Sequence, residues 1–215
     1  MYQAVIFDLD GTLLDTIHDL AKAGNYALIE MGLPIHSVDK YKQMVGYGKQ
    51  KMIDNLLPDC CKSGARVADK LFDSYYNHHM LDNTKEYVGI SDVLKGLKAK
   101  KIKLGVLTNK PHDFAIKIVE HYFPGLFDMV FGMEKDSVVK PDPHILLNMI
   151  SDLKVDNSEV IYVGDSDVDI LTGKNALVDT LSVSWGFRDK KQLSALKPTY
   201  LIDEVKQLTD IILGR

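Results

Sequence analysis

The chain has 215 residues, of which 46% are hydrophobic and 26% charged, with a formal net charge of −4. This length suits one sizeable domain or a core with a smaller insert. The charge balance argues against a basic nucleic-acid-binding protein or a charged disordered tail, and the apolar runs are too short to span a bilayer.

The N-terminus and the cysteines favour a cytoplasmic location. The chain enters an apolar, strand-like segment at once and has no signal-peptide layout. Its only cysteines, Cys60 and Cys61, are adjacent, and neighbouring cysteines rarely form a disulfide. We therefore expect two free thiols in a reducing compartment and partners that are neither nucleic acid nor membrane. Composition does not distinguish a monomer from a homodimer.

Strand-like and helical patterns alternate through most of the chain. Apolar runs without strict alternation, as expected for strands covered on both faces, occupy residues 4–7, 102–108, 127–132, 160–164 and 180–184. Helical patterns lie between them, over residues 90–101, 113–123 and 143–153. This alternation predicts an α/β fold with a doubly wound, mostly parallel sheet.

One long segment interrupts this rhythm. Between Asp15 and Asn83 we find only helical patterns, over residues 17–31, 38–45, 49–57 and 64–80. Roughly seventy residues are too many for a plain crossover connection. We predict an inserted α-helical cap domain over residues 15–83 and a catalytic core of residues 1–14 and 84–215, with hinges near residues 14–16 and 83–87.

Polar motifs follow the predicted strands at their carboxyl ends, where parallel α/β sheets bind ligands. "DLDGT" (8–12) follows the first strand, "TNKP" (108–111) the second and "GDSDVD" (164–169) the fourth, while "KPDP" (140–143) starts a helix. We expect these four motifs to meet at one edge of the sheet.

The first motif places two carboxylates, Asp8 and Asp10, at the end of an apolar strand. Two like charges in such a setting repel each other and lose hydration, so they need a compensating charge. With Asp165 they offer the hard oxygen ligands that suit Mg²⁺. The sequence therefore predicts a magnesium site.

The remaining motif residues have groups that hold phosphate oxygens: the Thr108 hydroxyl, the Asn109 amide and the Lys140 ammonium. Phosphoryl transfer needs little beyond positioning and charge neutralisation, and a carboxylate can act as the nucleophile. These residue types together predict Mg²⁺-assisted phosphoryl transfer.

"DLDGT", "LTN", "KPDP" and "GDSDVD", in this order on these elements, resemble the four motifs of the haloacid dehalogenase superfamily over nearly the whole chain. The resemblance implies that Asp8 is the nucleophile and Asp10 the general acid and base. It also implies that Mg²⁺ is held by the Asp8 carboxylate, the Asp10 backbone carbonyl and Asp165. Asp169 would orient the water ligands of the metal or Lys140.

Further features of the chain narrow the reaction. The superfamily members that dehalogenate lack the second aspartate of the first motif, so Asp10 argues against dehalogenation. "VSWGFRDKKQL" (183–193), "PTYLID" (198–203) and "VGYGKQKMI" (45–53) resemble segments of phosphoglycolate phosphatases. We therefore expect a phosphatase that hydrolyses a small phosphorylated metabolite, 2-phosphoglycolate, through an aspartyl-phosphate.

Other functions stay open at this point. An inorganic pyrophosphatase or a nucleotide or sugar phosphatase of the same family would differ only in substrate. A mutase of the β-phosphoglucomutase kind would share the cap, although those enzymes typically read "EDS" in the last motif. A non-catalytic phosphate-binding module would belong to another class, and a pure binder has no need of both a nucleophile and an acid.

Lys49 has two competing interpretations, and Asp167 has one. Lys49 follows two glycines in the predicted cap, Gly46 and Gly48. These glycines either break two helices and leave Lys49 in water, or form a loop in which Lys49 recognises a substrate carboxylate. For Asp167 we expect only a favourable interaction with the dipole of its helix.

Overall fold

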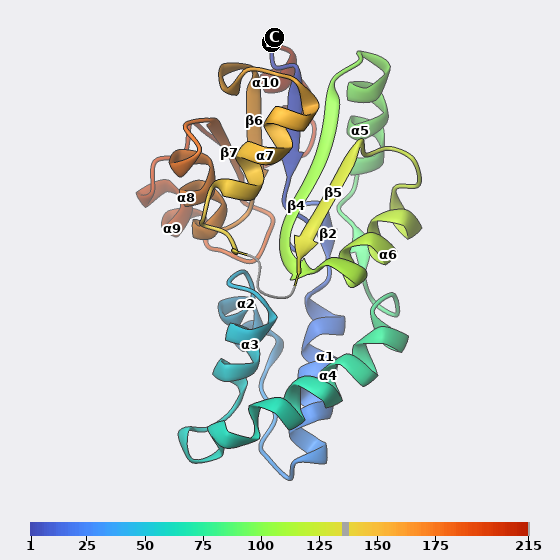
Figure 1. The fold of residues 1–215 in the computed structure, drawn as a ribbon, viewed down its shortest axis with the longest axis vertical. Helices are drawn as coiled ribbons and strands as arrows, with labels where there is room; N and C mark the ends of the chain where they lie inside the picture. The colour runs from blue at the N-terminus through green and yellow to red at the C-terminus, as the bar shows by residue number, and fades with distance from the viewer. Residues whose placement is uncertain (135–137, 215) are drawn as a thin grey trace.

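The computed structural model describes residues 1–134 and 138–214 (Figure 1). Its main sheet has six parallel strands in the order β5-β4-β1-β6-β7-β8. These strands are β1 (Ala4–Phe7), β4 (Lys103–Pro111), β5 (Met129–Met133), β6 (Val160–Gly164), β7 (Asp179–Val183) and β8 (Tyr200–Ile202). The order reverses at β1, which confirms the predicted doubly wound α/β class.

The central strand is buried on both faces. Ala4 and Ile6 pack into one hydrophobic cluster, and Val5 and Phe7 pack into another. Successive side chains of a strand point to opposite faces, so an uninterrupted apolar run is what a strand between two helical layers requires.

Helices cover both faces of the sheet. The cluster around Ile6 includes side chains of α7 (His144–Leu153), and the cluster around Phe7 includes side chains of α5, α6 and α10. The bounds of the remaining core helices are α5 (Ile90–Ala99), α6 (His112–Tyr122), η2 (Asn157–Glu159), α8 (Asp167–Asn175), α9 (Lys190–Ala195) and α10 (Gln207–Leu213).

A second group of helices, which we call the helical insert, lies between two short strands. β2 (Leu14–Asp15) and β3 (Lys85–Glu86) pair antiparallel with each other. The helical insert between them consists of α1 (Ile17–Glu30), α2 (Val38–Met44), α3 (Lys49–Leu56), η1 (Asp59–Gly64) and α4 (Ala65–His79). Figure 1 shows it beyond the end of the sheet toward which the β5 arrow points. We retain the division into a core and a cap as a proposal.

One buried aspartate connects the two ends of the helical insert. Asp19, in the first turn of α1, is 1% exposed. Its carboxylate accepts hydrogen bonds from the backbone N–H groups of Asn83 (2.9 Å) and Thr84 (2.8 Å). It also accepts from the side chains of the same two residues, at 2.7 and 2.9 Å. The sequence analysis did not identify this connection between the predicted hinges.

Within the part of the chain that is described, no helix combines the length and apolar character needed to cross a membrane.

Candidate active site

Strand register brings the polar motifs to one edge of the sheet. Phe7 pairs with Val106 of β4 on one side and with Val163 of β6 on the other. Asp8, Thr108 and Asp165 follow these residues by one or two positions. The predicted meeting of the motifs therefore results directly from the pairing of the central strands.

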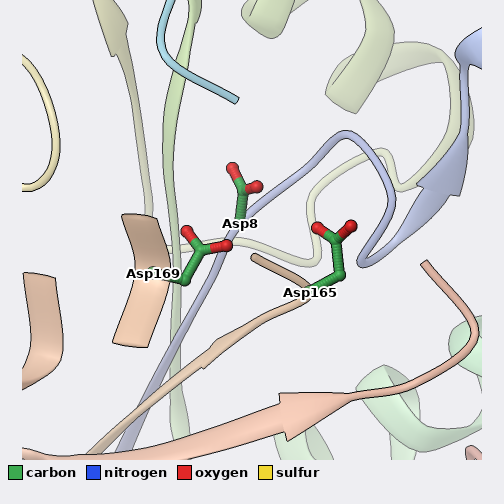
Figure 2. Close-up of side chains that lie close together, drawn as sticks. All are labelled: Asp8, Asp165 and Asp169. Atoms are coloured by element: carbon green, nitrogen blue, oxygen red, sulfur yellow. The ribbon is translucent and has the colours of Figure 1, made fainter. Parts of the chain in front are cut away.

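Three carboxyl groups converge at this edge. Carboxylate oxygens of Asp8, Asp165 and Asp169 all lie within 4.8 Å of one another, and all three residues are buried. Figure 2 shows Asp8 at the end of β1, Asp165 after β6 and Asp169 on α8, with the carboxyl groups directed to the same side.

The local backbone fixes the two aspartates of the last motif. Ser166 and Asp169 form a capping box at the start of α8, in which Asp169 Oδ2 accepts from the Ser166 N–H at 3.0 Å. Asp165 accepts from the Phe187 N–H at 2.7 Å and from Thr12 Oγ1 at 3.2 Å. A Cβ added at Gly11 would lie 2.4 Å from Asp165 Oδ2, so a larger residue there would displace this carboxylate.

Lys140 neutralises part of this charge. Its ammonium nitrogen lies 2.9 Å from Asp8 Oδ1, 2.7 Å from Asp169 Oδ1 and 2.9 Å from the Tyr162 hydroxyl oxygen. The Lys140 side chain is only 3% exposed. Within residues 1–134 and 138–214, only Asp169 and the Tyr162 hydroxyl accept hydrogen bonds from this ammonium. The contact with Asp8 is an ion pair, and among the described residues Asp8 Oδ1 has no hydrogen-bond donor.

The burial of these charges shifts their pKa values. Burial raises the pKa of Asp8 to about 6 although Lys140 opposes the shift. Burial and the charges of Asp169 and Asp8 raise the pKa of Asp165 well above its usual range. Burial alone would lower the pKa of Lys140, but Asp169 and Asp8 raise it well above that of a free lysine.

The donor set fits a magnesium ion. Three buried carboxylates face a single buried ammonium, which leaves uncompensated negative charge at this edge. All three donors are hard oxygen atoms, the type that Mg²⁺ prefers. Asp8 and Asp165, two of the residues that the sequence analysis assigned to the metal, are therefore compatible with it, and the third carboxylate of the cluster is Asp169 in place of Asp10.

Asp10 lies apart from the cluster of three and pairs with a different lysine. The Lys110 ammonium lies 3.0 and 3.1 Å from the two Asp10 carboxylate oxygens and 2.8 Å from the hydroxyl oxygen of Tyr76, a residue of α4. Burial raises the pKa of Tyr76 to about 12, with Lys110 opposing the shift. The sequence analysis assigned no function to Lys110 or Tyr76.

The pairing of β4 with β5 is irregular between Leu107 and Pro111, and this irregularity places the second motif in the site. The Thr108 hydroxyl accepts from the Lys110 N–H at 3.3 Å. The Asn109 amide contacts backbone only: it donates to the carbonyls of Gly46 (2.9 Å) and Lys140 (3.0 Å) and accepts from the Lys140 N–H (2.9 Å). These bonds position Lys140 and the helical insert, and the phosphate contact expected of this amide stays a prediction.

A small cavity lies between the sheet edge and the helical insert. Its volume is ≈ 50 Å³, on the order of four water molecules. Of the predicted site residues, Asp165 and Asp169 are absent from the lining, and the others are present: Asp8, Asp10, Lys49, Thr108, Asn109 and Lys140. Tyr76 and Lys110 line the cavity as well.

Lys49 reaches this cavity but is engaged by carboxylates of α4. Its ammonium lies 2.9 Å from Asp69 and 2.7 Å from Asp73, and its side chain is 16% exposed. The structure therefore differs from the interpretation in which Lys49 is solvated. Asp69 and Asp73 would compete with a substrate carboxylate for the Lys49 ammonium.

Asp167 does more than complement a helix dipole, contrary to the expectation from the sequence. Its carboxylate accepts from Arg188 Nε at 3.1 Å and from the hydroxyl of Tyr47 in the helical insert. Arg188 also donates to the backbone carbonyls of Lys42 and Val45, the latter at 2.7 Å. The last motif is thereby connected to the helical insert.

Comparison with known protein families identifies the family to which the chain belongs. The family model of the haloacid dehalogenase-like hydrolases matches residues 5–183. The chain belongs to this family, which confirms the resemblance carried by the four motifs.

Named relatives are similar over most of their length. A phosphoglycolate phosphatase of Psychrobacter arcticus is 33% identical over 98% of this chain and 96% of its own. One of Pseudomonas putida is 31% identical over 95% of this chain and 77% of its own. A solved structure of a Lactobacillus delbrueckii subsp. bulgaricus protein, 32% identical, superposes with a TM-score of 0.93 and covers 100% of this chain and 99% of its own.

Proposed function

We propose that this protein is a Mg²⁺-dependent phosphatase that hydrolyses 2-phosphoglycolate through an aspartyl-phosphate on Asp8. The observation that carries the proposal is the buried arrangement of Asp8, Asp165 and Asp169 around the Lys140 ammonium. It combines a nucleophile, a set of metal ligands and a fixed positive charge at the switch point of the sheet, where α/β proteins bind ligands.

In the first step, a carboxylate oxygen of Asp8 forms a bond to phosphorus while the bond from phosphorus to the ester oxygen breaks. Asp10 donates its proton to the departing alkoxide. In the second step, Asp10 takes a proton from the water that attacks the aspartyl-phosphate, so that Asp8 is regenerated and phosphate is released.

Lys140 and Thr108 line the cavity beside Asp8, where their ammonium and hydroxyl groups would bind phosphate oxygens and hold phosphorus in line for attack. Asp169 positions the Lys140 ammonium through the 2.7 Å contact. When bound by the Asp8 carboxylate, the Asp10 backbone carbonyl and Asp165, Mg²⁺ supplies positive charge that stabilises the transferring phosphoryl group.

The helical insert would act as a cap over this site. Asn109 and Arg188 of the core donate to its backbone carbonyls, and the cavity between the two parts is small. Such a cap excludes bulk water from the reacting phosphate, and it opens to admit substrate. The hinges would lie at β2 and β3.

The choice of 2-phosphoglycolate is supported by the names of the relatives from Psychrobacter arcticus and Pseudomonas putida. A cytoplasmic location and a monomeric or homodimeric state also belong to the proposal. The free thiols of Cys60 and Cys61 support the location.

The proposal is tested by phosphate release in the presence of Mg²⁺ across a panel: 2-phosphoglycolate, 2-hydroxyethyl phosphate, a sugar phosphate, a nucleotide and pyrophosphate. We expect kcat/KM to be highest for 2-phosphoglycolate. A preference for pyrophosphate or a nucleotide would replace the proposed substrate. Isomerised sugar phosphate in place of free phosphate would indicate a mutase, and no turnover of any compound would indicate a binding module.

A further inference from the structure

Three lysines line the cavity, and they differ in how much negative charge surrounds each one. Lys140 contacts two carboxylates, those of Asp8 and Asp169. Lys49 also contacts two, those of Asp69 and Asp73. For Lys110, by contrast, the only carboxylate partner within the described residues is Asp10. Of the three lysines, Lys110 therefore has the least negative charge around it and is the best placed to bind another anion.

Lys110 is buried, and its surroundings are mostly apolar. Its side chain is 2% exposed, and its ammonium lies 4.8 Å from the centre of the Tyr76 ring. Leu20, Phe72 and Phe114 also line the cavity. A charge in such surroundings interacts more strongly with an anion than it would in water.

The Tyr76 hydroxyl adds a directed donor. Its oxygen accepts a hydrogen bond from Lys110 at 2.8 Å, so its own hydrogen remains to be donated. In residues 1–134 and 138–214 we find no acceptor for that hydrogen, although Tyr76 is only 1% exposed. A buried donor without an acceptor costs free energy unless a ligand supplies the acceptor.

We propose that Lys110 and Tyr76 together form the subsite that binds the carboxylate of the substrate. This inference rests on the proposed function, since it assigns the non-reacting end of the same substrate. One carboxylate oxygen would accept from the Tyr76 hydroxyl and the other from the Lys110 ammonium, which would be shared between the substrate and Asp10.

The subsite also spans the two parts of the molecule. Lys110 lies on β4 of the core, and Tyr76 lies on α4 of the helical insert. The two donors are therefore together only when the helical insert lies against the core, so a substrate with a carboxylate favours this closed arrangement. A phosphomonoester without that group lacks this interaction.

The test compares two substrates that differ at this end only: 2-phosphoglycolate and 2-hydroxyethyl phosphate, in which a hydroxymethyl group replaces the carboxylate. Tyr76→Phe removes one oxygen and keeps the ring stacked on Phe72 at 5.3 Å. We expect the ratio of the two kcat/KM values to fall about tenfold, mainly because KM for 2-phosphoglycolate rises. Lys110→Met should lower the ratio at least about 100-fold.

Tyr75→Phe is the matched control, because Tyr75 is the preceding residue of α4 and its ring stacks on Tyr26 and His79 instead. In Tyr75→Phe, the ratio of kcat/KM for 2-phosphoglycolate to kcat/KM for 2-hydroxyethyl phosphate should equal that of the wild type. Thermal unfolding of each variant identifies losses that result from misfolding, to which Tyr76→Phe is less prone than Lys110→Met.

The two proposals fail in different ways. A wild-type protein that hydrolyses 2-phosphoglycolate well, with an unchanged ratio in folded Tyr76→Phe and Lys110→Met variants, would overturn the subsite alone. A wild-type protein that does not hydrolyse 2-phosphoglycolate would overturn the proposed function, and this inference with it.

Discussion

The ammonium nitrogen of Lys140 lies 2.9 Å from a carboxylate oxygen of Asp8, although the two side chains are only 3% and 10% exposed. Lys140 follows α6 and β5, far along the chain from the first strand. This contact places a permanent positive charge beside the proposed nucleophile. Taking two charges out of water is costly, so this pair points to a site selected for chemistry more than for stability.

Removal of the Lys140 charge should destabilise the protein. Lys140→Met leaves the carboxylates of Asp8 and Asp169 buried without their cation, a change that typically costs about 3–5 kcal/mol. We expect the Tm of the metal-free protein to fall by roughly 6–20 °C. Lys190→Met is the control, since Lys190 forms an exposed pair with Asp203 and exposed pairs contribute little to stability. Equal losses in the two variants would contradict this description of Lys140.

Asp8→Asn should abolish turnover without unfolding the protein. An amide of the same shape cannot form the aspartyl-phosphate, so we expect kcat to fall by at least about 10³-fold. The substitution also removes a buried charge whose burial raises its pKa to about 6, so Tm should stay the same or rise. Phosphate release and thermal unfolding measure the two effects, and a folded Asp8→Asn protein with wild-type activity would disprove the role of Asp8.

Mg²⁺ should stabilise the protein, and more strongly at neutral than at acidic pH. At about 100 times its Kd, a ligand adds about 2.7 kcal/mol of stability, or roughly 5–10 °C in Tm. The pKa values of Asp8 and Asp165 are raised in the fold.

The sign of the pH effect follows from these raised values. A carboxyl whose pKa is higher in the folded state favours folding at low pH and destabilises the fold once it is ionised, from about pH 4 to above pH 6 for Asp8. The metal relieves that destabilisation only when the carboxyls have lost their protons. Tm measured with and without Mg²⁺ at pH 5 and pH 7.5 tests this, and an equal shift at both pH values would argue against a carboxylate site.

Asp19 should be essential for the stability of the hinge region. Asp19→Ala removes the acceptor for donors of both Asn83 and Thr84, and a hydrogen bond to a charged group contributes about 1.5–3 kcal/mol. We expect a loss of at least about 3 kcal/mol in the free energy of unfolding. Asp152→Ala, at an exposed position of α7, should change it by no more than about 0.5 kcal/mol. Similar values from denaturant unfolding of both variants would exclude the role given to Asp19.

The long periodic elements were predictable from the sequence. Residues 160–164 were predicted as a strand and form β6, and the helix predicted over residues 49–57 is α3, Lys49–Leu56. The three-residue strand β8 and the helix α10 were missed, as were the two-residue strands β2 and β3. The three strands contain too few residues to show a period, whereas α10 is as long as the predicted α2 and its pattern was not recognised.

The site was predictable where strand register determines it and not where tertiary packing does. Asp8 and Asp165 follow β1 and β6, and Thr108 lies in the neighbouring strand β4, so their meeting was expected. Tyr76 was not identified because Phe72 and Tyr76 are four positions apart on α4, a spacing that also describes an ordinary buried helix face. The contact of Tyr76 with Lys110 depends on how the helical insert docks, and no local pattern encodes this.

The central claim, that Asp8 attacks phosphorus, is tested most directly by trapping the intermediate. The protein is mixed with 2-phosphoglycolate and Mg²⁺, quenched rapidly in acid and reduced with borohydride, which converts an aspartyl-phosphate to homoserine; peptide mass spectrometry then locates the change. We predict homoserine at position 8 in the wild type and none in Asp8→Asn. Rapid phosphate release with an unmodified Asp8, or with homoserine at another aspartate, would contradict the proposed mechanism.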